Sequence, residues 1–283
     1  MRKRQKIGKV IQQLKPIIDT LDKEKNPLLY QCVHDIIVEY ERGHLVDSEF
    51  ELALRLDTAD MTKSIPDSVV KVIVELYEYA AESGIYDEQG AAYNNIGSLY
   101  YNGRTGAKDY KKAIHYYQKS DACGYRLASE NLAFCYYYGF GTEIDYEKAY
   151  YYFSKAALAG RYEAMYKIGD MFRYGYYVEV DENMVRVSYM KAEQMMRDAW
   201  DTEGATGVRT GSVYLRLGDM YYEGIGLSKD CDRAYECYQR AERGIYSQMR
   251  NGDPYSRNDL KKVEERLREL QKILKDELPV LDF

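Results

Sequence analysis

Apolar residues recur at helical spacing along nearly the whole chain. Between residues 7 and 21, seven aliphatic side chains fall on one face of a helix, and Pro16 interrupts this stretch. Near the other end, apolar residues alternate at spacings of three and four, which predicts an amphipathic helix. These residues are Leu260, Val263, Leu267, Leu270 and Leu274. The pattern predicts an all-α protein.

Two further helices are predicted in the N-terminal region. The first begins at Asn26-Pro27 and continues through LLYQCVHDIIVEYERG, with Asn26 as its N-cap and Pro27 in its first turn. The second, SVVKVIVELYEYAAESG, has the pattern of the second helix of a degenerate helix pair that ends at Gly84. Residues 1–90 are therefore expected to form a helical region with one degenerate repeat.

The middle of the chain repeats itself four times between residues 91 and 246. Segment 97–124 reads GSLYYNGRTGAKDYKKAIHYYQKSDACG, and segment 133–160 reads AFCYYYGFGTEIDYEKAYYYFSKAALAG. These copies are 36 residues apart, and a third follows at the same spacing. The fourth comes 49 residues later, which predicts an insertion at about 197–210. Each copy predicts one helix pair, because stacked pairs bury an apolar face that one pair leaves open. The predicted pairs are 91–119, 128–156, 164–196 and 212–241.

Glycine and aspartate mark the helix ends in each copy. Glycine lies where the first helix stops and suits a left-handed conformation, at Gly103, Gly139, Gly175 and Gly224. Aspartate follows six residues later and suits the N-cap of the second helix, at Asp109, Asp145, Asp181 and Asp230. A small residue inside the first helix allows the second helix to approach closely, at Gly97, Ala133, Gly169 and Gly218. We expect these small residues to face alanines of the second helix, namely Ala113, Ala149 and Ala234.

The pattern small-x-x-Tyr-x-x-Gly, then Asp-Tyr-x-Lys-Ala, then Tyr-Tyr-x-Lys-Ala resembles the Sel-1-like repeat family, a relative of the tetratricopeptide repeats. The resemblance covers residues 91–246 and implies a right-handed α-solenoid of antiparallel helix pairs, usually a scaffold for protein partners. The third copy departs from the pattern at Val185, Ser188 and Met196. Its second helix is therefore expected to continue toward Trp200.

A solenoid needs helical caps at its ends. We expect residues 256–278 to form a C-terminal capping helix, because the apolar residues from Leu260 to Leu274 can cover the last repeat. The alternative is that this apolar stripe pairs with another copy of the chain to form a homodimer.

Composition narrows the range of partners. Hydrophobic residues make up 46% of the chain. The net charge is −6, which argues against nucleic acid as a partner because binding its phosphates requires a basic face. The basic start, MRKRQKIGK, is interpreted as a solvated terminus rather than an arm for nucleic acid or membrane. No signal peptide or membrane-spanning stretch is recognisable. We expect a cytoplasmic protein that binds neither nucleic acid nor membrane.

The residues that carry chemistry are scattered. Five cysteines without a CxxC pair indicate reduced thiols rather than a disulfide framework or a zinc site. The three histidines form no metal-binding motif, and the chain contains neither a phosphate loop nor a nucleophile elbow. The glycine pairs GFG and GIG are interpreted as turns between helices. We therefore predict no catalytic residues, no metal, no cofactor and no enzymatic activity.

The remaining candidate site is a surface rich in tyrosine, of which the chain has 32. In tetratricopeptide-like pairs the first helix lines the concave face, so the resemblance implies groove positions at −3, +1, +4 and +5 from the small residue. The predicted partner-binding residues are Asn94, Ser98, Tyr101, Asn102, Glu130, Phe134, Tyr137, Tyr138, Tyr166, Asp170, Arg173, Tyr174, Asp219, Tyr222 and Glu223. The more conservative interpretation of any one tyrosine is packing between helices.

The predicted function is therefore a non-enzymatic scaffold that binds a protein or peptide on the concave face. Acidic residues beside the tyrosines favour a peptide with basic as well as apolar residues, and Arg173 is expected to meet a carboxylate of that peptide. One alternative is a saccharide or small-molecule binder that uses the tyrosines for stacking. A hydrolase on a repeat scaffold is less favoured, because no acid, base and nucleophile converge.

Overall fold

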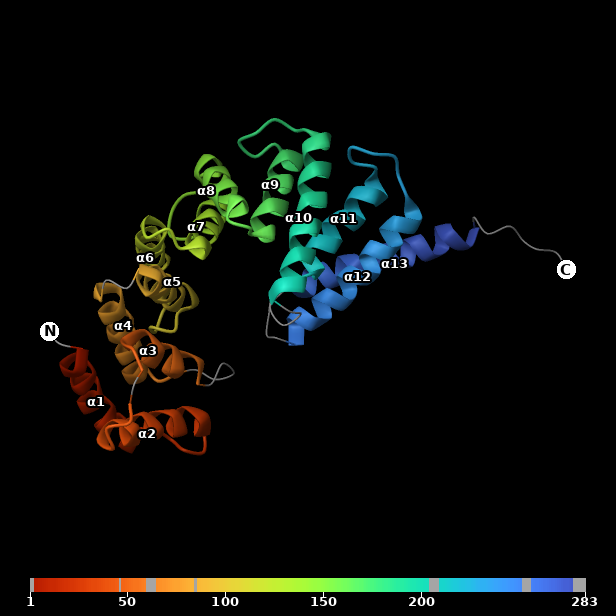
Figure 1. Cartoon of the computed structure of the whole chain (residues 1–283). Helices are drawn as coiled ribbons and strands as arrows, with labels where there is room; N and C mark the ends of the chain where they lie inside the picture. Colours follow the sequence, from red (N-terminus) through yellow and green to blue (C-terminus); the bar gives the residue numbers. More distant parts are fainter. Residues whose placement is uncertain are drawn as a thin grey trace. The chain divides into compact units, whose positions relative to one another are not determined.

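The computed structural model describes residues 3–45, 47–59, 65–83, 86–203, 209–250 and 256–276 (Figure 1). All regular structure within these ranges is helical, which confirms the all-α prediction. The chain divides into two compact units, Met1–Asp145 and Tyr146–Phe283. This boundary falls in the loop between the two helices of the second repeat. The units are therefore described separately.

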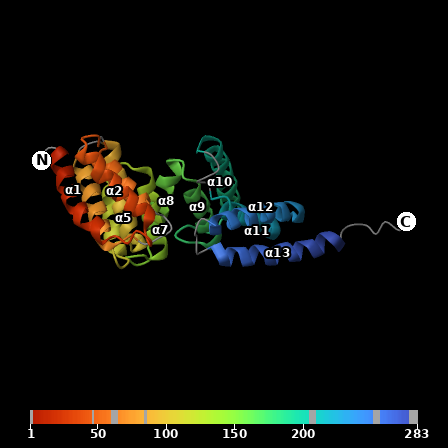
Figure 2. The same ribbon diagram turned by 90° about the horizontal axis from the view of Figure 1, so that it is seen from below.

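The first unit consists of helices that contact their neighbours in chain order (Figure 2). They are α1 (Lys3–Thr20), α2 (Pro27–Glu41), α3 (Glu49–Thr58), α4 (Asp67–Glu82), α5 (Tyr86–Asn102), α6 (Tyr110–Ala122) and α7 (Arg126–Tyr138). Helix α1 also contacts α4. The apolar face predicted for residues 7–21 is confirmed, because Val10, Ile11 and Leu14 are fully buried in the core of this unit. Pro16 lies inside α1.

Helix α2 begins at Pro27 as predicted, but the expected cap is wrong in one respect. The side chain of Asn26 accepts no capping hydrogen bond, and only its backbone carbonyl accepts one, from the amide of Tyr30 at 2.9 Å. The sequence pattern did not predict α3, which Ser48 and Glu51 start through a reciprocal capping box. Helices α3 and α4 contact each other. That they form a degenerate repeat stays a prediction. Gly84, proposed as its last residue, lies outside the described residues.

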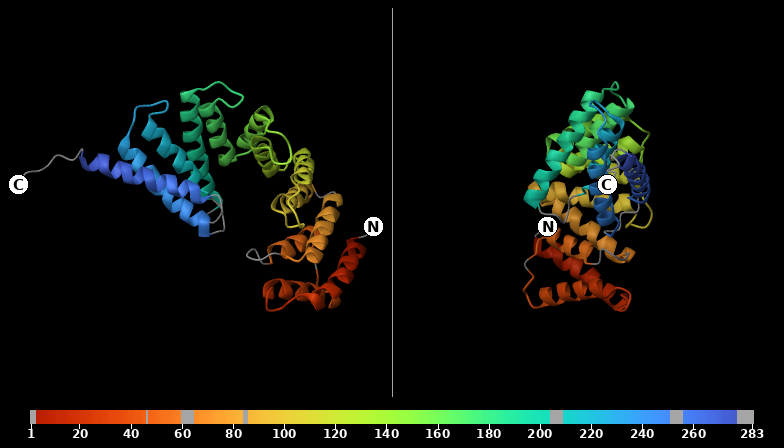
Figure 3. Two further views of the ribbon diagram at one scale, coloured as in Figure 1. Left: turned by 180° about the vertical axis from the view of Figure 1, so that it is seen from behind. Right: turned by 90° about the vertical axis from the view of Figure 1, so that its right-hand side faces the viewer.

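The second unit continues the same arrangement of paired helices (Figure 3). They are α8 (Tyr146–Leu158), α9 (Tyr162–Tyr174), α10 (Glu182–Glu203), α11 (Gly211–Glu223), α12 (Cys231–Arg250) and α13 (Ser256–Asp276). Helix α13 lies against α12 and α11, and its apolar residues from Leu260 to Leu270 are buried in one cluster with Tyr238 and Ile245. The capping role of α13 stays a prediction. Residues 277 and 278 of the predicted capping helix lie outside the described ranges.

The glycines at the ends of the first helices adopt the predicted left-handed conformation. Gly103, Gly139, Gly175 and Gly224 have φ values of 75°, 72°, 69° and 78°. Three aspartates also cap the second helices as predicted. Asp109 accepts a hydrogen bond from the amide of Lys112 at 3.0 Å, Asp181 accepts two from the start of α10, and Asp230 accepts one from Arg233. Asp145 directly precedes α8.

The small residues of the first helices do permit close approach. The predicted alanine lies beside Gly97, where a Cβ atom would be 3.3 Å from the backbone oxygen of Ala113, but a tyrosine ring is nearer at each glycine. A Cβ atom on Gly97, Gly169 or Gly218 would lie 2.6–2.7 Å from a ring carbon of Tyr117, Tyr189 or Tyr238, respectively. Each tyrosine follows its glycine by 20 residues. A tyrosine ring, rather than an alanine, therefore fills the space left by the missing side chain.

The second helix of the third repeat is extended, as predicted. Helix α10 has 22 residues, whereas α6 and α8 have 13 each. The three departures from the repeat pattern are all buried, and Met196 replaces the closing glycine with a residue that can continue the helix. Helix α12 is also long, with 20 residues. Of the insertion predicted at about 197–210, residues 204–208 lie outside the described ranges.

Candidate functional site

The predicted groove residues differ in exposure according to their place in the repeat. Those at position −3 are buried: Asn94, Glu130 and Tyr166. At +1, Asp170 and Asp219 are buried, whereas Ser98 and Phe134 are partly exposed. At +4, Tyr137 is only 9% exposed, and Tyr101, Arg173 and Tyr222 are partly exposed. At +5, Asn102, Tyr138, Tyr174 and Glu223 are exposed. The accessible part of the predicted surface is therefore the last turn of each first helix.

In the first unit this last turn belongs to a cluster of aromatic rings. The Phe140 ring centroid lies 5.8 Å from that of Tyr101, 5.0 Å from that of Tyr110 and 5.5 Å from that of Tyr138. Phe134 stacks on Tyr138 with centroids 6.2 Å apart. We call these five residues the aromatic surface. Tyr138 is 48% exposed and the other four are partly exposed, so the rings form an accessible apolar patch.

Two members of the aromatic surface, Tyr110 and Phe140, were not predicted from the sequence. Phe140 lies between the two glycines of the GFG turn, and Tyr110 is the first residue of α6. At Gly141, which has a φ of 75°, a Cβ atom would lie 2.5 Å from the carbonyl carbon of Tyr110. The turn therefore packs directly on the start of α6 and places Phe140 against the Tyr110 ring. The sequence feature that could have indicated Phe140 is an aromatic residue between two turn glycines.

Polar residues at the predicted groove positions of the first unit join helices to one another. The Asn131 side-chain amide donates to the Asn94 side-chain oxygen at 2.8 Å, which links α7 to α5. Ser98 and the hydroxyl of Tyr117 lie 3.3 Å apart and link α5 to α6. Because both partners of each bond belong to this unit, these predicted groove residues contribute to its packing.

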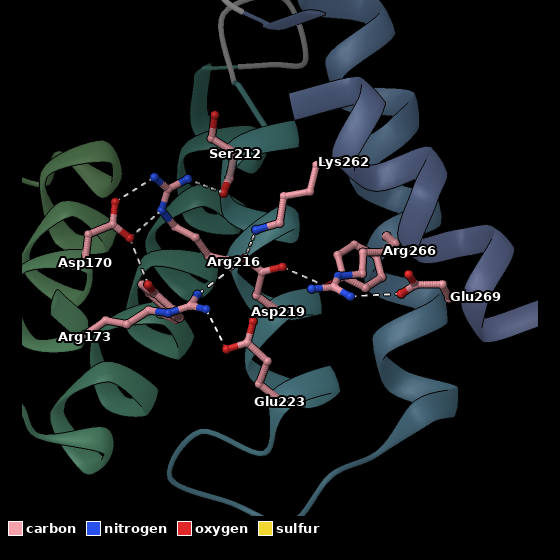
Figure 4. A network of polar contacts seen from close by, with 11 residues as sticks. Asp170, Arg173, Ser212, Arg216, Asp219, Glu223, Lys262, Arg266 and Glu269 are labelled. Carbon is pink, nitrogen blue, oxygen red and sulfur yellow. Dashed lines mark hydrogen bonds and ion pairs between the residues drawn. The ribbon is translucent and has the colours of Figure 1, made fainter. Parts of the chain in front are cut away.

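In the second unit, the buried carboxylate of Asp170 is at one end of a polar network (Figure 4). Arg216 donates two hydrogen bonds to it, at 2.7 Å from Nε and 2.6 Å from Nη2. The hydroxyl of Tyr189 donates a third at 2.8 Å, and Lys167 Nζ lies 3.4 Å away. The Arg216 guanidinium also lies 4.2 Å from the centroid of the Tyr166 ring. Asp170 therefore connects α9, α10 and α11.

Asp219 repeats this arrangement one repeat later. The hydroxyl of Tyr238 donates to it at 2.8 Å, and Lys262 of α13 donates at 2.6 Å. Arg173 lies between Asp219, at 3.4 Å, and Glu223, at 2.7 Å (Figure 4). The guanidinium expected to meet a partner's carboxylate is thus already held by two carboxylates of this chain.

At the exposed edge of the network, Tyr222 lies under a cation. The Arg266 guanidinium is 4.4 Å from the centroid of the Tyr222 ring, and it donates to Glu269 at 2.9 Å. The Tyr222 hydroxyl donates to the same carboxylate at 3.2 Å. Tyr222 is therefore fixed against α13 by a cation–π contact and a hydrogen bond.

Burial and ion pairing act in opposite directions on Asp170. Burial raises the pKa of its carboxyl, but Arg216, Lys167 and the hydrogen bond from Tyr189 outweigh this effect and hold the pKa below its usual value. Burial and the neighbouring carboxylates raise the pKa values of Tyr189 and Tyr238, so both hydroxyls stay protonated and act as donors. The ionised carboxylate of Asp170 therefore joins α9, α10 and α11 through its ion pairs and hydrogen bonds.

The part of the chain that the structure describes offers neither a metal site nor a membrane-spanning helix. No three or more His, Cys, Asp or Glu side chains lie where they could together hold a metal ion. Among the described helices, none combines the length and apolar character needed to cross a membrane.

The stacked helix pairs, with glycine turns and a recurrent small residue in each first helix, define an α-solenoid repeat protein. The sequence profile of the Sel1 repeat matches residues 90–124, 125–160, 163–184 and 212–244. The chain is a Sel1-like repeat protein. The third match stops at residue 184, directly before the first departure from the pattern at Val185. Sel1 repeats commonly serve as scaffolds for protein interactions and typically carry no catalytic activity.

One solved structure shows the same fold. The chain is similar to a Sel1 repeat protein from Oxalobacter formigenes, with a TM-score of 0.55 and 21% sequence identity over 81% of this chain and 87% of that one. A protective antigen of uropathogenic Escherichia coli with an SLR fold gives a TM-score of 0.47 and 21% identity, over 85% of this chain and 56% of the other. The comparison with curated proteins gives no match.

Proposed function

We propose that this protein is a scaffold that binds a protein or peptide through the first helices of its repeats and catalyses no reaction. The observation that carries the proposal is the aromatic surface, in which five rings from two successive repeats lie in contact and remain accessible. Exposed aromatic residues on a rigid helical support are typical of binding hot spots. Tyr174, 54% exposed in the third repeat, provides a further ring at the position equivalent to Tyr138.

The structure narrows the chemistry that such a partner would need. Of the four acidic residues that favoured a basic peptide, Glu130, Asp170 and Asp219 are buried, and only Glu223 is exposed. Arg173 is engaged by Asp219 and Glu223. We therefore expect apolar side chains of the partner to make the main contacts with the rings. Basic residues would add a weaker, salt-dependent attraction to a chain of net charge −6.

The proposal includes a reducing, cytoplasmic environment for the protein. It rests on the odd number of cysteines and on their spacing. All five lie in described segments as free thiols.

Capture of the partner on the immobilised protein, followed by mass spectrometry and calorimetry with the purified partner, tests the proposal. Tyr138→Ala is the informative variant, because the ring is exposed and its removal leaves the helix core intact. We expect it to weaken binding by about 1–2 kcal/mol, or roughly 5–30-fold. Tyr137 is a poorer probe, because a side chain that is 9% exposed also contributes to folding.

Tyr151→Ala is the matched control, since Tyr151 is 61% exposed and lies outside the aromatic surface. Its binding should equal that of the unmodified protein. Equal affinities of the Tyr138 and Tyr151 variants would show that the partner binds elsewhere. A partner that is chemically altered by the protein would contradict the scaffold role.

A further inference from the structure

A cavity of about 520 Å³ opens in the second unit, where the end of α10 meets the start of α11 and the middle of α12. It shares no residue with the network of Figure 4. Its principal lining residues are Met196, Arg197, Trp200, Tyr214, Arg240 and Arg243. Volumes of this size are typical of pockets that bind small molecules, roughly 300–1,000 Å³.

The cavity depends on the extension of two second helices. In the first two repeats the second helix stops before the closing glycines, Gly124 and Gly160. Met196 replaces this glycine in the third repeat and Ile245 in the fourth, so α10 and α12 both continue. The extension of α10 carries Trp200 to one side of the cavity. In α12, Ser247 of the extension lines the cavity together with the preceding Arg240, Arg243 and Gly244.

The charge of the lining is positive, although the chain as a whole is acidic. Three guanidinium groups face one described carboxylate, that of Asp201. Arg197 pairs with Glu193 at 2.6 Å, and Arg240 lies 5.4 Å from the centroid of the Tyr214 ring. Arg243 is exposed and forms no ion pair with any residue that the structure describes. A guanidinium free of partners can form two parallel hydrogen bonds to a carboxylate or phosphate.

Apart from Thr210 and Ser247, the remaining lining is apolar and aromatic. Trp200 is the only tryptophan of the chain, and it is 45% exposed. Met196 is buried, and the Tyr214 ring is partly exposed. A large indole held at the edge of a cavity offers a flat apolar face for stacking.

We propose that this cavity binds a free small organic anion in which a carboxylate or phosphate is attached to a flat apolar body. The arginines would hold the anionic group, with Arg243 supplying a guanidinium that pairs with no described residue, and Trp200 would stack on the body. This inference is independent of the aromatic surface and of a protein partner, because it uses other residues.

Because Trp200 is the sole tryptophan, its fluorescence reports binding at this site directly. Excitation at a wavelength that tyrosine does not absorb, during titration with phenyl phosphate and with 3-phenylpropanoate, should give a saturable change. Inorganic phosphate lacks the apolar body, and the neutral 3-phenylpropanamide lacks the negative charge. Each should therefore bind at least about tenfold more weakly. Equal affinity for inorganic phosphate would overturn the role of the apolar body, and equal affinity for the amide would overturn the role of the charge.

Arg243→Gln should weaken binding of both anions by roughly 10–100-fold, and Arg243→Lys should recover part of the loss. Arg233→Gln is the matched control: it removes the same charge from an exposed arginine of the same helix that pairs with Asp230. It should bind like the unmodified protein. No saturable binding, or an unaffected Arg243→Gln variant, would overturn the site. Tighter binding of a peptide ending in a phenylalanine carboxylate than of 3-phenylpropanoate would overturn the free molecule as the ligand.

Discussion

The hydroxyl of Tyr238 donates a 2.8 Å hydrogen bond to Asp219, and 49 residues earlier Tyr189 makes the same bond, of the same length, to Asp170. Each tyrosine also fills the space beside a glycine of the facing helix, Gly218 or Gly169. A missing side chain, a ring and a buried carboxylate thus form one repeated joint between the two helices of a pair. In the first repeat Ser98 takes the place of the aspartate and lies 3.3 Å from the hydroxyl of Tyr117.

Loss of one hydroxyl from this joint should destabilise the fold. Tyr238→Phe keeps the ring beside Gly218 but removes a donor to a buried carboxylate, which costs about 1–3 kcal/mol. Urea unfolding followed by circular dichroism measures the change. Tyr246→Phe is the matched control, since that hydroxyl is exposed and lies 3.4 Å from Glu264. A Tyr238→Phe variant as stable as the Tyr246→Phe variant would contradict the importance of the joint.

Two glycines of the second unit allow the cost of backbone strain to be measured apart from the cost of steric overlap. Gly160 has a φ of 87°, and no atom lies within 4 Å of the place that a Cβ atom would take, so Gly160→Ala should cost about 1 kcal/mol from strain alone. Gly226 has a φ of 64°, and a Cβ atom there would lie 2.4 Å from the carbonyl oxygen of Glu182. Gly226→Ala should therefore be clearly the more destabilising variant in thermal unfolding. Equal melting temperatures would contradict this ranking.

Acid should weaken the second unit through Asp170. Its carboxyl has a lowered pKa in the folded protein, so between that pKa and the ordinary value of 3.8 the unfolded chain binds more protons than the folded one. The contribution of Asp170 is therefore complete above pH 3.8 and is lost as the pH falls below it. Unfolding free energies of the unmodified protein and of Asp170→Asn should converge on acidification. A constant difference between them would exclude this titration.

Burial should protect one thiol more than the others. It raises the pKa of Cys135 to about 12, and the residue is inaccessible to solvent. Alkylating reagents attack the thiolate, so Cys135 should remain unlabelled in the folded protein and react after unfolding. Mass spectrometry of the labelled peptides measures this, with the partly exposed Cys123 as the internal reference. Equal labelling rates for the two thiols before unfolding would contradict the prediction.

Local signals in the sequence predicted much of the fold correctly. Left-handed glycines and capping aspartates depend on the few residues around them, so Gly139 and Asp109 could be assigned from the repeat alone. The extension of α10 could also be predicted, because Met196 stands at the position where a glycine ends the equivalent helices. Each of these features is decided within about one turn of chain.

The side-chain environment could not be predicted in the same way. Nothing near Asp170 in the sequence indicates Arg216, which is 46 residues away, and the pairing arises only when the helices stack. The same stacking leaves Tyr138 exposed but Tyr137 buried, although the two are adjacent. Which tyrosines remain accessible depends on the rotation of each helix within its layer, and the repeat alignment specifies that rotation only approximately.

Lys262 of α13 occupies, toward Asp219, the position that Arg216 of α11 occupies toward Asp170. The terminal helix thus presents to the fourth repeat the contact that the fourth repeat presents to the third. At this contact, the last repeat therefore needs no residues that differ from those of an internal repeat. Duplication of a helix pair during evolution, or its insertion by design, could lengthen the array between α12 and α13 while reusing an interface that the protein already contains.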